Sequence, residues 1–598
     1  MLYFLVLKVL LIQEVMMRYF LKKTSLKKGE YLQIYISEYR RGIGSRNRCF
    51  RSIGYVSELK DKGIKDPVAH YQEQVKRMND ELNEKEASDR ARKVGKQAPK
   101  RYAGYFLLKG VAGSLSFFEK AVRKLSGERQ FQYDVYDLMM ALVYSRATFP
   151  ASKRKTHEEI IPLLFEKMDE ASYSQVLSCC EYIGSEYEKL VSFLTGSVKK
   201  TFGINTSETY FDCTNFYFEI DKEDEFRKKG PSKENRHDPI VGMGLLLDRN
   251  QIPIGMKLYP GNESEQPKIR EVISGLKKEN SITGRTIQVA DKGLNCARNI
   301  HDAINRNDGY IFSRSLKKMA DRDAEWFKGL DIGTWDVVYE NDENGKKTEK
   351  YRYFSFTEDF DYDYKDDSGQ TVRFKATEKR ILTFNPRLRM KKILEINRMV
   401  DKAQRLCLYN AKKDEFGECG KFVSFVTDSG KKAKAVLDEE AIEKERMFAG
   451  FNMLVTSETH LSDRTVYGTY HNLWRIEQTF RMMKSFLDAR PVYVSTLNKI
   501  KGHFLICYIG VVLERLLEFH VLGSSFCHEK IMAFIHDFSL VRMDSKDYIN
   551  LLTSNDEVGQ FLEKYLCPEV TNYIITPADI TKIFKLKLNK RIDGFGSV

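Results

Sequence analysis

Hydrophobic and polar residues alternate near the start of the chain, where Leu32, Ile34 and Ile36 occupy every second position. A period of two is typical of a β-strand with one buried face. We predict a second short strand near residues 53–56, so that residues 17 to about 60 would form a small β unit.

Five arginines crowd the predicted connection between these strands: Arg40, Arg41, Arg46, Arg48 and Arg51. Arginines in such a turn can contact DNA phosphates. A solvated basic loop accounts for them equally well, so this cluster alone decides nothing.

Helical spacing follows this β unit. Residues 66–100 are charged and helix-prone, and residues 128–200 place apolar side chains such as Leu138 and Leu142 one helical turn apart. We therefore predict that most of the N-terminal region is helical.

The middle of the chain predicts three strands, a helix, a strand, a helix and a strand. These segments are residues 209–220, 240–247, 252–259, 265–278, 286–290, 294–304 and 310–313. A further helix near residues 472–486 would complete the order of an RNase-H-like α/β domain.

Residues 320–455 differ from their surroundings, because they combine many aromatic and charged residues with short β-like runs. These runs are residues 335–339, 351–356, 380–384 and 423–426. A structureless loop of this length inside a compact domain is implausible, so we predict a β-rich insertion.

The composition favours a polyanionic partner. The chain of 598 residues has 98 Lys and Arg against 84 Asp and Glu, a net charge of +14. Nucleic acid is the commonest polyanion, although many other soluble proteins are also basic. The ten cysteines include no Cys-x-x-Cys pair, which argues against zinc knuckles and a disulfide framework and favours reduced thiols in the cytoplasm.

The first residues are apolar but lack the basic start and cleavage site of a signal peptide. They are also too short to span a bilayer. We expect that the native chain starts at Met16 or Met17, with a weak membrane or partner helix as the alternative.

Two aspartates stand where strands would present them. Asp212 is a lone carboxylate in an aromatic strand, where burial is costly unless it is paired or metal-bound. Asp291 follows an apolar strand, at the end where open α/β sheets place their sites. The ordinary alternatives are an outward-facing Asp212 and an Asp291 that caps the next helix.

A third carboxylate, Glu477, lies on the helix predicted near residues 472–486. Helical spacing places Tyr470, Trp474, Arg481 and Lys484 on the same face as Glu477. An ordinary surface helix, with a Glu477–Arg481 pair worth ~0.3–0.5 kcal/mol, would look the same.

Tyr470, Glu477 and Lys484 have the spacing Tyr-(6)-Glu-(6)-Lys. This resembles the Tyr-Arg-Glu-Lys signature of DDE transposases from bacterial insertion sequences. The resemblance is collinear from about residue 17 to 520 and includes other segments: residues 210–214, 238–247, 252–254, 260–263, 291–293, 310–314, 490–493 and 500–507. One position departs, because Leu473 stands where the signature has Arg, and Arg475 is the nearest cation.

The resemblance implies a two-metal site held by Asp212, Asp291 and Glu477, with Asp212 bridging two Mg²⁺ ions and Mn²⁺ able to replace them. Magnesium prefers hard oxygen ligands such as carboxylates. Water would nick one strand at the transposon end, and the freed 3′-hydroxyl would attack a second phosphodiester without a covalent protein intermediate.

The resemblance also implies contacts to DNA. Tyr470 and Lys484 would touch phosphates of the transposon end, and Arg314, Arg475 and Arg481 are weaker candidates for DNA binding. A flipped base could stack on Trp326 or Trp335 of the insertion, although a tryptophan packed in the insertion's own core is the more ordinary interpretation.

The implied partners are double-stranded DNA, at the terminal inverted repeats and at the target, and a second copy of the chain in a synaptic homodimer. We expect a cytoplasmic, nucleoid-associated bacterial protein with no membrane contact and no nucleotide cofactor. Two alternatives stay open: a different nuclease of the RNase H fold, such as a resolvase, and an inert DNA-binding remnant or inhibitor of transposition.

We thus predict an α/β protein whose RNase-H-like catalytic core is interrupted by a β-rich insertion, with a mainly helical N-terminal region and C-terminal helices. The predicted divisions are 1–16 as an extension, 17–203 as a DNA-end-binding region, 204–318 and 456–515 as the catalytic domain, 319–455 as the insertion and 516–598 as the helical C-terminal region.

Overall fold

The computed structural model describes residues 15–40, 44–92, 100–167, 171–231, 237–279, 284–316, 327–341, 345–409, 413–426, 434–489, 492–543 and 546–592. Arg41, Trp326, Arg490 and Pro491 lie outside the described residues, as does most of the predicted extension. The chain forms two compact units, the first ending at Lys100 and including Val541–Ile549, and the second containing the rest.

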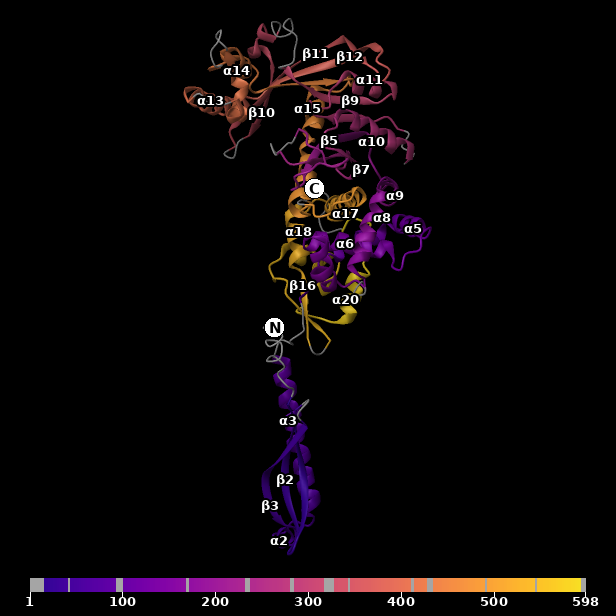
Figure 1. Cartoon of the computed structure of the whole chain (residues 1–598), viewed down its shortest axis with the longest axis vertical. Coiled ribbons are helices and arrows are strands. Elements are labelled where there is room, and N and C mark those ends of the chain that lie inside the picture. The colour runs from indigo at the N-terminus through magenta and orange to yellow at the C-terminus, as the bar shows by residue number, and fades with distance from the viewer. Residues whose placement is uncertain are drawn as a thin grey trace. The chain divides into compact units, whose positions relative to one another are not determined.

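The first unit is built on an antiparallel sheet of three strands in the order β1 (Val15–Leu26), β2 (Gly29–Arg40) and β3 (Gly44–Tyr55). Helices α2 (Val56–Asp61) and α3 (Pro67–Arg92) follow (Figure 1). The alternating Leu32, Ile34 and Ile36 are 0–3% exposed and form its core.

Two expectations for this unit were wrong. The hydrophobic pattern predicts two strands, whereas β1 adds a third, and β3 is much longer than the run at residues 53–56. Consequently Arg46, Arg48 and Arg51 lie within β3 and not in a turn. The hydrophobic pattern did not predict the full length of β3, because β3 is an edge strand whose described side chains are largely exposed.

The second unit begins with β4 (Lys100–Tyr102) and a group of helices, as predicted for residues 128–200. They are α4 (Phe106–Ser114), α5 (Ser116–Ser126), α6 (Val135–Thr148), α7 (Lys153–Lys155), α8 (Tyr173–Ser185) and α9 (Tyr187–Thr201). Helices α4, α6, α8 and α9 pack with α17 (Leu497–Leu516), which is buried along most of its length (Figure 1).

The approach of α8 to α17 depends on two glycines. A Cβ at Gly184 would collide with the backbone oxygen of Asn498, and one at Gly502 would collide with that of Cys180. The apolar α17 is therefore a core helix, and no helix among the described residues is long and apolar enough to cross a membrane.

A mixed sheet of nine strands forms the centre of the second unit, in the order β10-β11-β12-β15-β9-β8-β5-β6-β7. Its strands are β5 (Glu208–Tyr217), β6 (Ile240–Asp248), β7 (Pro253–Pro260), β8 (Ile287–Ala290), β9 (Gly309–Arg314), β10 (Asp336–Asn341), β11 (Lys347–Lys365), β12 (Thr371–Phe384) and β15 (Phe451–Thr456). Strands β5, β8 and β9 are parallel, and the other pairings are antiparallel.

The predicted central elements are all present, because their apolar runs correspond to buried strands and to helices at the sheet. Helix α10 (Gln266–Glu279) joins β7 to β8, and α11 (Ala297–Asn305) joins β8 to β9. The mixed α/β class expected from the sequence is thus confirmed.

The inserted segment contains a strand at each of the four predicted runs, including β13 (Val423–Val426), which pairs with β14 (Lys434–Leu437). It also holds helices that the sequence analysis did not predict, α13 (Pro386–Leu408) and α14 (Glu439–Met447). Strands β10–β12 extend the central sheet, and Trp335 is buried against Phe354 and Phe451 in the same core.

After this segment come α15 (Asp463–His471) and α16 (Trp474–Arg481), which continues as a π-helical turn over Met482–Phe486. The C-terminal region combines helices with short strands: α18 (His528–Asp537), β16 (Ser539–Arg542), β17 (Tyr548–Asn550), α19 (Glu557–Tyr565), β18 (Ile574–Ile575) and α20 (Pro577–Phe584).

Candidate active site

Asp212 lies in β5, and Asp291 directly follows the neighbouring parallel strand β8. Phe211 of β5 is in register with Ala290 of β8, and each aspartate is the next residue along its chain. Paired strands lie about 4.8 Å apart and successive side chains alternate between faces. The two carboxylates therefore point to the same face of the sheet.

Strand β9 contributes a third polar side chain at the same level. Ala290 is in register with Phe312, and Ser313 follows Phe312. The Ser313 hydroxyl donates a hydrogen bond of 3.2 Å to Oδ1 of Asp291. Three adjacent parallel strands thus present Asp212, Asp291 and Ser313 in one row.

Tyr470 reaches this row from α15, which Ser462 caps at its N-terminus. Its hydroxyl donates to Oδ1 of Asp291 over 3.1 Å. Burial raises the pKa of Tyr470, and the negative charges of Asp291 and Asp212 raise it further. Tyr470 therefore lies close to both aspartates and carries its proton at neutral pH.

Two contacts fix the helical segment that bears Glu477 along β5. Asn472 donates to the hydroxyl of Tyr210 over 3.4 Å, and Nζ of Lys484 lies 5.4 Å from the ring centre of Phe216. Alternation places Tyr210 and Phe216 on the same face of β5 as Asp212.

The spacing between these contacts positions Glu477 along the strand. Asn472 and Lys484 are twelve positions apart, about 18 Å at the rise of a helix, and Tyr210 and Phe216 are six positions apart, about 20 Å at the rise of a strand. Glu477 comes five residues after Asn472, about 7.5 Å along the helix. Asp212 comes two residues after Tyr210, about 6.6 Å along the strand, so the two carboxylates stand at similar heights.

Glu477 is exposed, whereas Asp212 is partly buried. Among the described residues, no group of three or more His, Cys, Asp or Glu side chains is arranged to hold a metal ion. The structure thus brings Asp212, Asp291 and Tyr470 together, and leaves Glu477 on the adjoining helix without closing a three-carboxylate site.

The arginine candidates lie apart from the aspartates or face other groups. Arg314 donates to the hydroxyl of Tyr362 over 3.1 Å, and this hydroxyl in turn contacts the buried Glu378. Arg475 lies near Tyr210, whose pKa its charge lowers, although burial raises that pKa overall. Burial lowers the pKa of His528 in the C-terminal helix α18, and the positive charge of Arg481 contributes to this shift.

Sequence reasoning missed Ser313, Asn472 and a cleft whose lining includes Gly293, two residues after Asp291. Pro231, Tyr259 and Gly293 line this cleft, together with Asn215, Ile240, Gly242, Gly261, Glu263, Ser264, Glu265 and Gln266. Burial raises the pKa of Tyr259, with a smaller contribution from Asp212. Only Ser313 and Asn472 had a sequence signal, namely their positions at a strand end and beside the Tyr470 motif.

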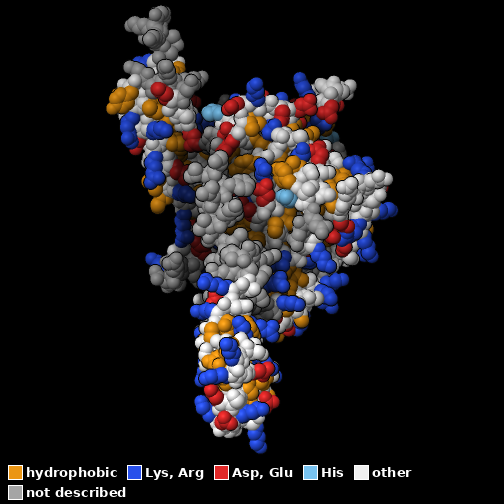
Figure 2. Space-filling view, turned by 60° about the horizontal axis from the view of Figure 1, so that its bottom comes forward, with side chains coloured by type: hydrophobic (Ala, Val, Ile, Leu, Met, Phe, Trp, Pro, Cys, Tyr) orange, Lys and Arg blue, Asp and Glu red, His pale blue; other side chains and the backbone are white. Residues whose placement is uncertain are grey.

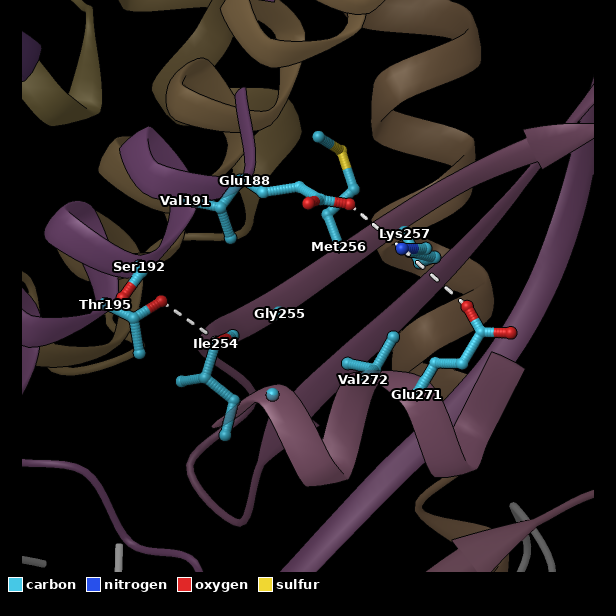
Figure 3. Close-up of a pocket in the computed structure, with 11 residues that line it drawn as sticks. Glu188, Val191, Ser192, Thr195, Ile254, Gly255, Met256, Lys257, Glu271 and Val272 are labelled. Atoms are coloured by element: carbon cyan, nitrogen blue, oxygen red, sulfur yellow. Dashed lines mark hydrogen bonds and ion pairs between the residues drawn. The ribbon is translucent and has the colours of Figure 1, made fainter. Parts of the chain in front are cut away.

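A second pocket lies between α9, the edge strand β7 and α10 (Figure 3). Lys257 bridges Glu188 at 2.9 Å and Glu271 at 3.7 Å, and Thr195 donates to the backbone oxygen of Ile254. These contacts join helices to the sheet edge, which is a structural role.

The family comparison agrees with the residues assembled at the aspartates. A family model described as a transposase DDE domain matches residues 211–513, just over half of the chain. This match begins one residue before Asp212 and includes Asp291, Tyr470, Glu477 and Lys484. No curated protein matches the chain. The chain belongs to the transposase DDE domain family.

Proposed function

We propose that this transposase catalyses metal-dependent cleavage at the ends of a bacterial insertion sequence and joins the cut ends to target DNA. We further propose that its central strands, β5 to β9, with the helices that join them and α16, form an RNase-H-like catalytic domain. The inserted segment would lie between its third carboxylate and the other two.

One observation carries the proposal. Asp212 and Asp291 end up in register on adjacent parallel strands, and Tyr470, from the segment that resembles the family signature, donates to Asp291. These residues are 79 and 179 positions apart, because 291−212 = 79 and 470−291 = 179. Chance alone rarely brings such distant polar residues to one strand end.

The donor set fits magnesium. Carboxylate oxygens are the hard ligands that Mg²⁺ prefers, and Asp212, Asp291 and Glu477 would hold the two ions. Bound metal would supply the charge that lowers the pKa of an attacking water and neutralises the phosphate oxygens. Glu477 lies on α16 beside β5, so its carboxylate would have to approach the two aspartates to complete the set.

The other residues position these groups. Tyr470 and Ser313 both donate to Oδ1 of Asp291, and they would thereby hold its carboxylate in one orientation. Lys484 lies over Phe216 at the far end of the same face of β5, where its ammonium group can contact a phosphate as a point charge. Two copies of the chain would hold two DNA ends together.

Strand transfer distinguishes this function from that of a simple nuclease. Purified protein would be mixed with labelled DNA that ends at the element boundary and with an unlabelled circular plasmid, in Mg²⁺. The proposal expects the labelled 3′ end to become joined to the plasmid. Nicking without joining would favour a different nuclease, and binding without nicking would favour the inert DNA-binding alternative.

A further inference from the structure

The sheet of the first unit has two chemically different faces. Leu32, Ile34 and Ile36 of β2 lie on the covered face and are 0–3% exposed. The intervening residues of β2, such as Gln33 and Tyr35, are half-buried and point to the opposite face. We call this opposite side the open face.

The open face is defined by the strand register. It contains these residues of β1, β2 and β3: Arg18, Phe20, Lys22, Thr24, Tyr31, Gln33, Tyr35, Ser37, Asn47, Cys49 and Ser52. None of these described residues is acidic. The two glutamates of the sheet, Glu30 and Glu38, are both on the covered side.

The charge of the unit is concentrated in the sheet. The described residues 15–40 and 44–55 contain nine Lys and Arg but only two Glu, a net charge of +7. Helix α3 instead contains five Lys and Arg against six Asp and Glu, a net charge of −1. Lys and Arg side chains elsewhere are dispersed over the surface in view (Figure 2). The sheet is therefore the basic part of this unit.

The arginines that stand out in the sequence lie on the other side of the sheet. Arg46 and Arg48 are in register with Glu38 and Ile36, which belong to the covered face. Arg48 also pairs with Glu38 at 3.3 Å. The open face instead offers the exposed cations Arg18 and Lys22.

From these observations we infer that the open face of β1–β3 is a surface that binds duplex DNA, with Arg18 and Lys22 on phosphates and Gln33 and Asn47 facing base edges. This inference rests on the proposed function, since it takes the element's end as the ligand. Glutamine and asparagine amides match the N6 and N7 atoms of adenine in the major groove. Strands of a sheet are known to enter that groove.

The aromatic residues favour a duplex over a single strand. Phe20 and Tyr35 pack against each other with ring centres 5.8 Å apart, and Nζ of Lys22 lies 4.6 Å from the Tyr35 ring centre. Because these two rings already pack against each other and against Lys22, they position the ammonium group of Lys22. Single-strand binding instead requires free rings on which bases stack. The positive charges of Arg18 and Lys22 would also repel each other if the open faces of two copies of the chain packed together.

The test uses the full chain and a labelled duplex taken from the DNA that flanks its reading frame, in EDTA so that no cutting occurs. The double variant Arg18→Ala/Lys22→Ala should bind at least about tenfold more weakly and lower the slope of log K against log salt by about 2. Gln33→Ala should weaken binding to the end by roughly 5- to 150-fold, with scrambled duplex little affected.

Matched controls come from the same unit. Lys76→Ala removes an exposed cation from α3 and should bind the duplex as the wild type does. Circular dichroism melting checks that every variant is folded. The inference is overturned if the double variant binds no more weakly than Lys76→Ala, if the wild type prefers the single strand, or if it does not bind the duplex.

Failure of this inference differs from failure of the proposed function. Unchanged binding by the double variant, together with metal-dependent cutting by the wild type, would reject the open face and leave the transposase activity in place. Loss of binding in the double variant, together with no cutting by the wild type in any metal, would support the open face and reject the activity.

Discussion

Tyr470 donates a hydrogen bond of 3.1 Å to Asp291, although 179 positions separate them in the chain. The contact links α15, the helix that follows the inserted segment, to the end of β8 in the central sheet. Charge-assisted hydrogen bonds of this kind hold a carboxylate in one orientation. We therefore expect Tyr470 to position Asp291 for metal.

Replacing Tyr470 by Phe tests this role. The ring stays and only the donor is lost, so the fold should be unchanged. A hydrogen bond to a charged group contributes about 1.5–3 kcal/mol, and the cleavage rate at saturating DNA should fall roughly tenfold or more. The Mg²⁺ concentration needed for half-maximal rate should rise. An unchanged rate and metal requirement would contradict the positioning role.

The two cations at the end of the signature helix should behave differently. Lys484 lies on the face of β5 that carries Asp212, whereas Arg481 acts on α18 side chains. Lys484→Ala should weaken binding of the element's end and reduce its salt dependence by about one phosphate contact. Arg481→Ala, the matched control, should bind DNA as the wild type does. A binding titration in which Arg481→Ala weakens binding and Lys484→Ala does not would contradict these different roles.

The central strands could be predicted from the sequence because they are buried on both faces, so their apolar runs are nearly continuous. Asp212 and Asp291 could be singled out because each carboxylate interrupts or ends such a run. The third strand of the first unit could not be predicted, since β3 is an edge strand with an arginine-rich, exposed surface. The contact of Asn472 with Tyr210 could not be predicted either, because the two residues are 262 positions apart and meet only through tertiary packing.

Local sequence patterns also could not predict that β10–β12 extend the central sheet. Strand β11 has 19 residues with long partly exposed stretches, so its alternation is weak, and only its pairing with β12 shows its length. Helix α13 lies in the same segment, where the aromatic content favoured strands. The sequence therefore predicted strands there without their placement in the central sheet.

Glycine 184 should tolerate no side chain. Gly184→Ala would drive a Cβ into the backbone of Asn498 and force α8 away from α17. We expect the free energy of unfolding to fall by about 1–3 kcal/mol or more. Gly275→Ala, in helix α10, meets no atom within 4 Å and should raise it by up to about 1 kcal/mol. Urea unfolding of both variants checks this, and equal effects would contradict the packing described for α8 and α17.

Glu514 makes stability depend on pH. Its carboxylate is buried without a hydrogen-bond partner, 4.0 Å from the guanidinium of Arg515, and Glu518 and Glu529 lie near it. Burial raises the pKa of Glu514 to about 8. The folded state therefore holds this proton more tightly than the unfolded state.

The direction in which stability changes with pH follows from this difference in proton binding. Below the unfolded pKa, near 4.5, the group is protonated in both states and costs nothing. Between that pH and about 8 the folded state is progressively destabilised. Glu514→Gln should therefore raise the melting temperature at pH 8 by about 2 °C or more and change it little at pH 5. A loss of stability at pH 8 would show that the charged form is favourable.

We propose that Asp212, Asp291 and Glu477 hold the metal that DNA cleavage needs. The most direct measurement compares wild type with Asp212→Asn, Asp291→Asn and Glu477→Gln on labelled DNA carrying the element's end, each in Mg²⁺, in Mn²⁺ and in EDTA. Asp221→Asn, an exposed carboxylate just beyond β5, is the control. We expect nicking at the element boundary by wild type and control with either metal, and none by the other three variants. Cutting by those three variants, or by the wild type in EDTA, would contradict it.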